Sequence, residues 1–199
     1  TQGAVRFENV DFQYPLNKSG ENILSDISFE VVSGLTLVIL SPPGSGKSTI
    51  ARLIPRFYDP TARRILFDGQ DIARVSITSL RQAIGGVQQD PFLFTASVDH
   101  NMAYADPSTN FDQIVQASTD AQIHSFIEEL PRRYQTLVGE DGVSLSGGQR
   151  QRVSIARGTL TDAPIFIFDD ATAAIDAGTE QRIRRALKAR AGTHTPIII

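Results

Sequence analysis

The stretch that most constrains the fold is residues 35–57, LTLVILSPPGSGKSTIARLIPRF. Its first six residues form an apolar run rich in branched side chains, which is typical of a strand buried on both faces of a sheet. Residues 41–49 then turn through two prolines and two glycines, and from Lys47 to Phe57 apolar residues recur at helical spacing. A strand, a glycine-rich loop and a helix in this order direct several backbone N–H groups at one point. The stretch therefore predicts a phosphate site.

The residue types of the loop favour a nucleoside triphosphate with Mg²⁺. Gly44 and Gly46 would let the backbone close around the phosphates, Lys47 would reach the terminal phosphates, and the Ser48 hydroxyl would ligate the metal. The strict form of this loop has glycine where this chain has Ser41, and a positive φ there would cost serine about 1–2 kcal/mol. The alternative is an ordinary turn, but the flanking strand and helix favour the functional interpretation.

Composition narrows the class of protein. The chain has 199 residues, of which 41% are hydrophobic and 21% charged, and these values predict a soluble globular domain with a sizeable core. Its net charge of −3 gives no reason to expect a nucleic-acid partner. The absence of cysteine excludes disulfides and thiolate metal sites. No apolar run approaches the roughly 20 residues that span a bilayer.

The N-terminal part predicts a small antiparallel sheet. Residues 5–14 and 22–32 each read as a strand, and the polar break 15–21 separates them. Alternation in the first strand places four side chains toward the core: Val5, Phe7, Val10 and Phe12. Tyr14 ends this strand and is either a half-covered edge residue or a platform for an adenine ring.

The middle of the chain mixes short elements and then becomes helical. Residues 65–71 predict a strand with an Asp-Gly turn, and residues 74–83 predict a short helix. Residues 85–94 predict a short strand that ends near Gln89. In residues 95–135 the apolar positions fall at helical intervals between plausible caps, which indicates a helical insertion.

Ser146, Gly147, Gly148 and Gln149 fit a capping box at the start of an amphipathic helix. The box is either an ordinary helix cap or, because two glycines leave backbone amides bare at a helix N-terminus, a second anion site.

A fully apolar strand, residues 164–170, ends in Asp169 and Asp170. Carboxylates at a strand end are often solvated. Behind a phosphate loop, however, Asp169 would hold Mg²⁺ through water and Asp170 would accept a proton from the attacking water. A basic helix over 180–190 and a strand over 195–199 complete the chain.

Together these segments resemble the nucleotide-binding domain of the ATP-binding cassette (ABC) superfamily, and most of all its exporter branch. The matching segments, in family order, are Tyr14 (A-loop), 41–49 (Walker A), 86–90 (Q-loop, with Gln89), 136–142 (the exporter segment), 145–149 (signature LSGGQ), 165–170 (Walker B) and 173–176 (D-loop, with Asp176). The resemblance covers nearly the whole chain.

The resemblance implies an α/β fold: a P-loop NTPase core with a mainly parallel sheet, an N-terminal antiparallel β-subdomain and an inserted helical subdomain. The core would comprise 1–90 and 160–199, and the helical subdomain 91–159. ATP and Mg²⁺ would be the ligands of Tyr14, Ser41, Pro42, Pro43, Gly44, Ser45, Gly46, Lys47, Ser48, Thr49, Gln89 and Asp169. Ser48, Gln89 and Asp169 would serve the metal, and Asp170, Gln89 and Lys47 would be catalytic.

The family pairs two such domains head to tail, with ATP between one Walker A loop and the other domain's signature, here Leu145, Ser146, Gly147, Gly148 and Gln149. The implied partners are a second nucleotide-binding domain and the transmembrane domains of an exporter, at the cytoplasmic face of a membrane. The switch histidine of the family would follow residue 199, so the chain is expected to stop just before it.

The most consequential departure from the family is Asp170, which stands where the catalytic glutamate is usual. It suggests a subunit of a heterodimer whose own site is weak and whose signature completes the partner's site. The resemblance as a whole implies an enzyme domain that powers export by binding and hydrolysing ATP. The alternatives are a regulatory ATP-binding module with little hydrolysis at its own site and, more remotely, a soluble cassette ATPase of DNA repair or translation, which should carry coiled-coil insertions or basic surfaces. Ala62, Arg63 and Arg64 also replace a usual Ser-Gly turn.

Overall fold

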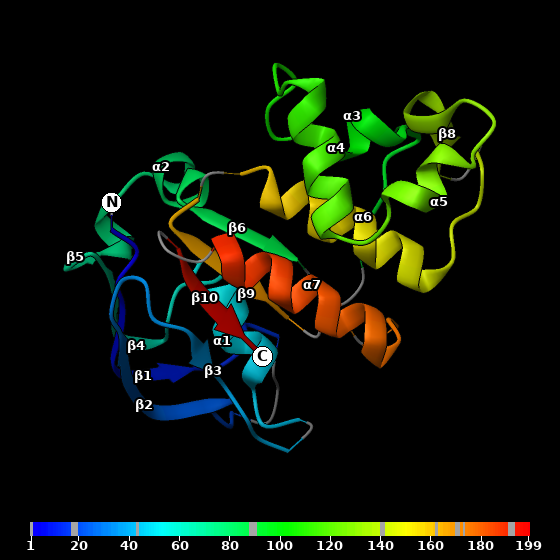
Figure 1. The fold of residues 1–199 in the computed structure, drawn as a ribbon. Coiled ribbons are helices and arrows are strands. Elements are labelled where there is room, and N and C mark those ends of the chain that lie inside the picture. Colours follow the sequence, from blue (N-terminus) through cyan, green and yellow to red (C-terminus); the bar gives the residue numbers. More distant parts are fainter. Residues whose placement is uncertain are drawn as a thin grey trace. The chain divides into compact units, whose positions relative to one another are not determined.

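The computed structural model describes residues 2–16, 20–42, 44–87, 91–139, 142–161, 163–169, 172, 174–190 and 194–199 (Figure 1). The chain divides into two compact units. The sheet unit comprises 1–85, 163–169 and 193–199, and the helical unit comprises 86–162 and 170–192.

An antiparallel sheet begins the sheet unit, as predicted. Its strands are β1 (Val5–Phe12), β2 (Leu24–Val31), β4 (Ala62–Phe67) and β5 (Gln70–Asp71), in the order β2-β1-β4-β5. The four apolar side chains predicted to alternate inward from β1 are each at most 1% exposed. Between β4 and β5, Asp68 and Gly69 both have positive φ, which is the two-residue hairpin turn that the Asp-Gly pair predicts.

A parallel sheet holds the C-terminal strands of the predicted core. It consists of β3 (Leu37–Val38), β10 (Thr195–Ile198), β9 (Ile165–Phe168) and β6 (Ile84–Val87), in the order β3-β10-β9-β6. The strand β10 pairs in parallel with β3 on one side and with β9 on the other. The apolar run of β9 is buried except at its last residue, as its sequence predicts.

The prediction of a doubly buried strand over 35–40 is wrong. Only two residues pair there, and Leu35 and Leu40 are 60% and 87% exposed. The reason is that β3 lies at the end of the strand order, so β10 covers one of its edges and little of the flanking run is drawn into the core.

Two short helices complete the sheet unit. The helix α1 (Lys47–Leu53) buries Ile50 and Leu53 and stops before Pro55, so Phe57 lies outside the helical pattern predicted for it. The predicted helix over 74–83 is a 3₁₀ turn, η1 (Ile72–Arg74), followed by α2 (Ile77–Gln82). Ser76 separates them as the α2 N-cap, because its hydroxyl accepts a hydrogen bond from the Ser79 backbone N–H.

The helical unit confirms the helical insertion predicted for 95–135. Its elements are β7 (Ala96–Ser97), α3 (Val98–Met102), α4 (Phe111–Asp120), α5 (His124–Glu128), η2 (Arg133–Gln135), β8 (Leu137–Val138), α6 (Gly147–Thr159) and α7 (Ala177–Arg190) (Figure 1). The helix α6 packs against α3 and α4, and α4 also contacts α5 and α7. The antiparallel pairing of β7 with β8 was not predicted.

One backbone strain in the sheet unit gives a stability prediction. Arg63 has φ 68°, in the left-handed region that favours glycine, beside a register shift between β1 and β4. We expect Arg63→Gly to raise the free energy of unfolding by about 0.5–1 kcal/mol, because relief of the Cβ clash exceeds the entropic cost of glycine in the unfolded chain. Urea denaturation of the variant measures this. Arg63→Ala keeps the Cβ atom and should change nothing, so an equal gain in both variants would contradict the backbone explanation.

Candidate functional site

The loop that leads into α1 has the backbone that a phosphate cradle needs. Gly44 and Gly46 have φ values of 80° and 91°, in the region where glycine is favoured. Gly46 is required for a second reason, because an added Cβ would lie 2.8 Å from Leu24 Cδ2 and 3.2 Å from the Ile23 carbonyl oxygen. Ser41 does not have a positive φ, so the backbone strain considered for a serine at this position does not arise.

Lys47, the first residue of α1, turns its ammonium back over this loop. Its Nζ donates hydrogen bonds to the carbonyl oxygens of Ser41 (2.6 Å) and Pro42 (3.0 Å). The hydroxyls of Ser41 and Ser45 hydrogen-bond to each other across the same loop. The loop therefore combines one positive charge with glycine-containing backbone, which is suited to binding polyphosphate.

The next residue, Ser48, contacts Asp169, which directly follows β9. The Ser48 hydroxyl donates a hydrogen bond to Asp169 Oδ1 at 3.0 Å, although the two residues are 121 positions apart. A hydroxyl and a carboxylate are the hard oxygen ligands that Mg²⁺ prefers. Among the described residues there is no cluster of three or more His, Asp or Glu that could hold a metal. A Mg²⁺ ion here would thus depend on water and phosphate oxygens for its remaining ligands, as is usual for this ion.

Tyr14, two residues after β1 ends, contacts α1 through its hydroxyl. Its hydroxyl hydrogen-bonds to the Thr49 hydroxyl at 3.1 Å and accepts from an Arg52 guanidinium nitrogen at 3.3 Å. Its ring meets those of Phe12 and Tyr58 edge to face, at centroid distances of 4.8 and 5.1 Å. Tyr14 is therefore fixed at both ring and hydroxyl, and its role as an adenine platform stays a prediction.

In the helical unit, the predicted capping box at the start of α6 is confirmed. Ser146 Oγ accepts from the Gln149 N–H at 3.3 Å, and Gln149 Oε1 accepts from the Ser146 N–H at 2.8 Å. Gly147 and Gly148 are the first two residues of a 13-residue helix whose first turn carries no acidic side chain. The positive end of this helix is therefore not neutralised from within its own first turn.

The predicted D-loop aspartate, Asp176, immediately precedes α7. Asp176 Oδ1 accepts a hydrogen bond from the Thr179 N–H at 2.9 Å. This backbone hydrogen bond is the main reason that the pKa of Asp176 lies below its usual value, and the side chain of Thr179 adds to the effect. Asp176 is therefore ionised at neutral pH.

Three of the predicted site residues lie outside the described residues: Pro43, Gln89 and Asp170. Their roles stay predictions, as do those of Ser45 and Leu145.

The structure also reveals a half-buried arginine that the sequence analysis did not single out. Arg157 of α6 donates to the backbone oxygens of Asn101 (2.7 Å) and Phe92 (3.0 Å), and burial lowers the pKa of its guanidinium. Asn101, which is fully buried, binds the N–H and C=O of Phe94. These bonds fix the segment that follows the predicted Q-loop to α6.

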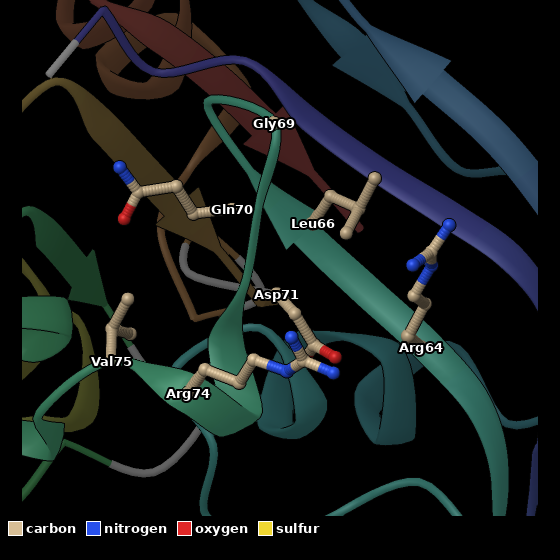
Figure 2. A pocket seen from close by; sticks show the side chains of 7 residues that line it. All are labelled: Arg64, Leu66, Gly69, Gln70, Asp71, Arg74 and Val75. Atoms are coloured by element: carbon tan, nitrogen blue, oxygen red, sulfur yellow. The ribbon is translucent and has the colours of Figure 1, made fainter.

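A cavity of about 400 Å³ lies elsewhere in the sheet unit, around the β4–β5 turn (Figure 2). Its lining residues are Arg64, Leu66, Gly69, Gln70, Asp71, Arg74 and Val75. None of them belongs to the predicted nucleotide site, and the Arg64 guanidinium already binds Glu8 at 2.6 Å.

Among the residues that the structure describes, no helix combines the length and apolar character that crossing a bilayer requires.

The comparisons with known proteins agree with this geometry. Residues 24–173 match the family model described as ABC transporter. The chain is 47% identical over 196 residues to an ATM1-type heavy metal exporter of Novosphingobium aromaticivorans, covering 98% of this chain and 32% of that protein. It is 42% identical over 197 residues to an ATP-dependent lipid A-core flippase of Chromohalobacter salexigens, covering 99% of this chain and 34% of that protein.

Among solved structures, a bacterial Atm1-family ABC exporter with ATP bound matches all of this chain and 35% of its own, with a TM-score of 0.94 and 47% identity. The chain thus spans about a third of the length of these relatives. The match confirms the predicted fold class, a P-loop NTPase domain with an antiparallel β-subdomain and a helical insertion. Since the family model covers most of its length, the chain belongs to the ABC transporter family.

Proposed function

We propose that this chain binds ATP with Mg²⁺ and hydrolyses it to power export through a membrane transporter. The observation that carries the proposal is the Ser48–Asp169 hydrogen bond, because it brings together two oxygen groups of the kind that bind Mg²⁺, one of them on the residue after Lys47. The relatives support the direction of transport, since one is named a heavy metal exporter and another a lipid A-core flippase.

In this proposal the loop and its neighbours divide the binding of Mg-ATP among them. The amides of residues 44–49 cradle the β- and γ-phosphates, and Lys47 exchanges its carbonyl partners for phosphate oxygens. Ser48 and Asp169 hold Mg²⁺, whose charge neutralises the phosphates, and Gln89 adds a further metal contact. The Tyr14 ring stacks on adenine, held by its bonds to Thr49 and Arg52.

The site is completed by a second nucleotide-binding domain paired head to tail. Ser146 and the amides of Gly147 and Gly148 then contact the γ-phosphate bound to the partner, and Asp176 lies at the same interface. By the family pattern, the ATP-binding core comprises 1–90 and 160–199, and the helical subdomain 91–159 carries the signature. In the structure, residues 170–192 group with the helical unit instead. The other partners are the transmembrane domains of the transporter. The chain contacts them through Gln89 and lies at the cytoplasmic face of the membrane.

Asp170 favours a heterodimer within this proposal. A base that is one methylene shorter than glutamate has less reach toward the attacking water, so ATP held by this chain's own loop turns over slowly. The signature is intact and completes the partner's site. In the limiting case the chain regulates by clamping ATP, and its partner performs most of the hydrolysis.

Removal of the Lys47 ammonium tests the proposal. Lys47→Ala in the full-length protein should weaken Mg-ATP binding by about 10- to 100-fold, because a charge-assisted hydrogen bond contributes about 1.5–3 kcal/mol. Isothermal titration calorimetry measures this. Lys188→Ala removes an exposed lysine from α7 and should bind like the wild type. Wild-type protein without affinity for Mg-ATP would overturn the proposed function.

A further inference from the structure

The start of α6 and the D-loop segment are joined by two contacts that the family motifs do not explain. Gln151 is only 4% exposed, and its Oε1 accepts a hydrogen bond from the Ala174 N–H at 2.9 Å. Gly148 approaches the same residue so closely that an added Cβ would lie 2.6 Å from the Ala174 carbonyl oxygen. Both contacts lie within the helical unit.

The spacing of Gly148 and Gln151 lets both residues face Ala174. Gly148 and Gln151 are three positions apart on one helix and therefore lie on the same face. Gln151 binds the N–H of Ala174, and Gly148 faces the carbonyl oxygen of the same residue with no room for a side chain between them.

Arg152, the next residue of α6, strengthens this junction. Its Nε donates to the Gly148 carbonyl oxygen at 3.3 Å, and its Nη1 donates to the Gln122 carbonyl oxygen at 2.7 Å. Burial lowers the pKa of Arg152, while the negative charge of Asp176 acts in the opposite direction and favours the guanidinium form. Asp176 thus interacts electrostatically with Arg152 of α6.

We propose that Gln151 is a positioning residue that fixes the D-loop segment, residues 174–176, against the signature tip, residues 146–148. The inference rests on the proposed function, in which both segments act at the partner's nucleotide. Because they belong to one junction, they meet the partner as a single preassembled surface and need not be ordered separately at each binding event. Gln151 itself touches neither nucleotide nor metal.

The test compares Gln151→Leu with Gln151→Glu in the full-length protein. Leucine removes the acceptor for the Ala174 N–H, whereas glutamate keeps an oxygen in its place. We expect Gln151→Leu to lower the single-turnover rate of ATP hydrolysis about 10- to 100-fold, with the calorimetric affinity for Mg-ATP unchanged, because misplacement of a contacting group acts on the reaction step. Gln151→Glu should restore most of the rate.

Ile155→Val is the matched control, because Ile155 is fully buried on the same helix and its apolar side chain cannot form a hydrogen bond. It should lower the melting temperature without the loss in rate. Equal rate losses in Gln151→Leu and Ile155→Val at equal stability, or a normal rate in Gln151→Leu with intact Mg-ATP binding, would overturn the inference and leave the proposed function standing. Loss of Mg-ATP binding in the wild type would overturn both.

Discussion

Replacing Asp170 by glutamate is expected to raise the single-turnover rate of ATP hydrolysis on the order of 10²-fold, within the 10²- to 10⁴-fold range of a positioned general base. In the proposed function, the added methylene would extend the carboxylate toward the water that attacks the γ-phosphate. Affinity for Mg-ATP should stay unchanged, since the phosphates and the metal are assigned to Lys47, Ser48 and Asp169. Rapid-quench measurement with protein in excess over ATP gives the rate directly.

The neighbouring carboxylate provides the control. Asp169→Glu lengthens the side chain that accepts from the Ser48 hydroxyl, and it should weaken Mg²⁺-dependent binding without any gain in rate. In mixtures with a partner chain, turnover should depend on the partner's glutamate. A wild-type homodimer with full activity, unimproved by Asp170→Glu, would refute the weak-site hypothesis.

The features that could be predicted from the sequence depend on neighbours within a few positions. The capping box of Ser146 and Gln149 closes over three residues, and the Asp68-Gly69 turn over two. Alternation in β1 depends only on the two-residue period of a strand. In each case the residue type determines the local geometry, so the pattern and the structure agree.

The failures depend on distant parts of the chain. The run over 35–40 has the composition of a buried strand, but its exposure is decided by the place of β3 at the end of the strand order. Gln151 reads as one more polar residue of an amphipathic helix, because its partner Ala174 is 23 positions away. The Arg157–Asn101 contact spans 56 positions. No local pattern records such pairs.

The two signature glycines look equivalent in the sequence, and the structure separates them. Among the described residues, an added Cβ on Gly147 would meet only Ala174 Cβ, at an ordinary 3.5 Å. Gly147→Ala should therefore fold normally. We expect it to slow single-turnover hydrolysis about 10²- to 10³-fold, the usual loss when one donor to a developing charge is removed, because the methyl group blocks the approach of the partner's γ-phosphate to this amide.

Gly148→Ala is the matching variant with the opposite expectation. Its Cβ would lie 2.6 Å from the Ala174 carbonyl oxygen, and that backbone cannot give way as a flexible side chain would. The clash should lower the free energy of unfolding by about 1–3 kcal/mol, measured by urea denaturation. Normal hydrolysis by Gly147→Ala would show that the signature tip does not contact phosphate. Equal destabilisation by both variants would instead contradict the packing described for the start of α6, since only one of the two glycines faces backbone.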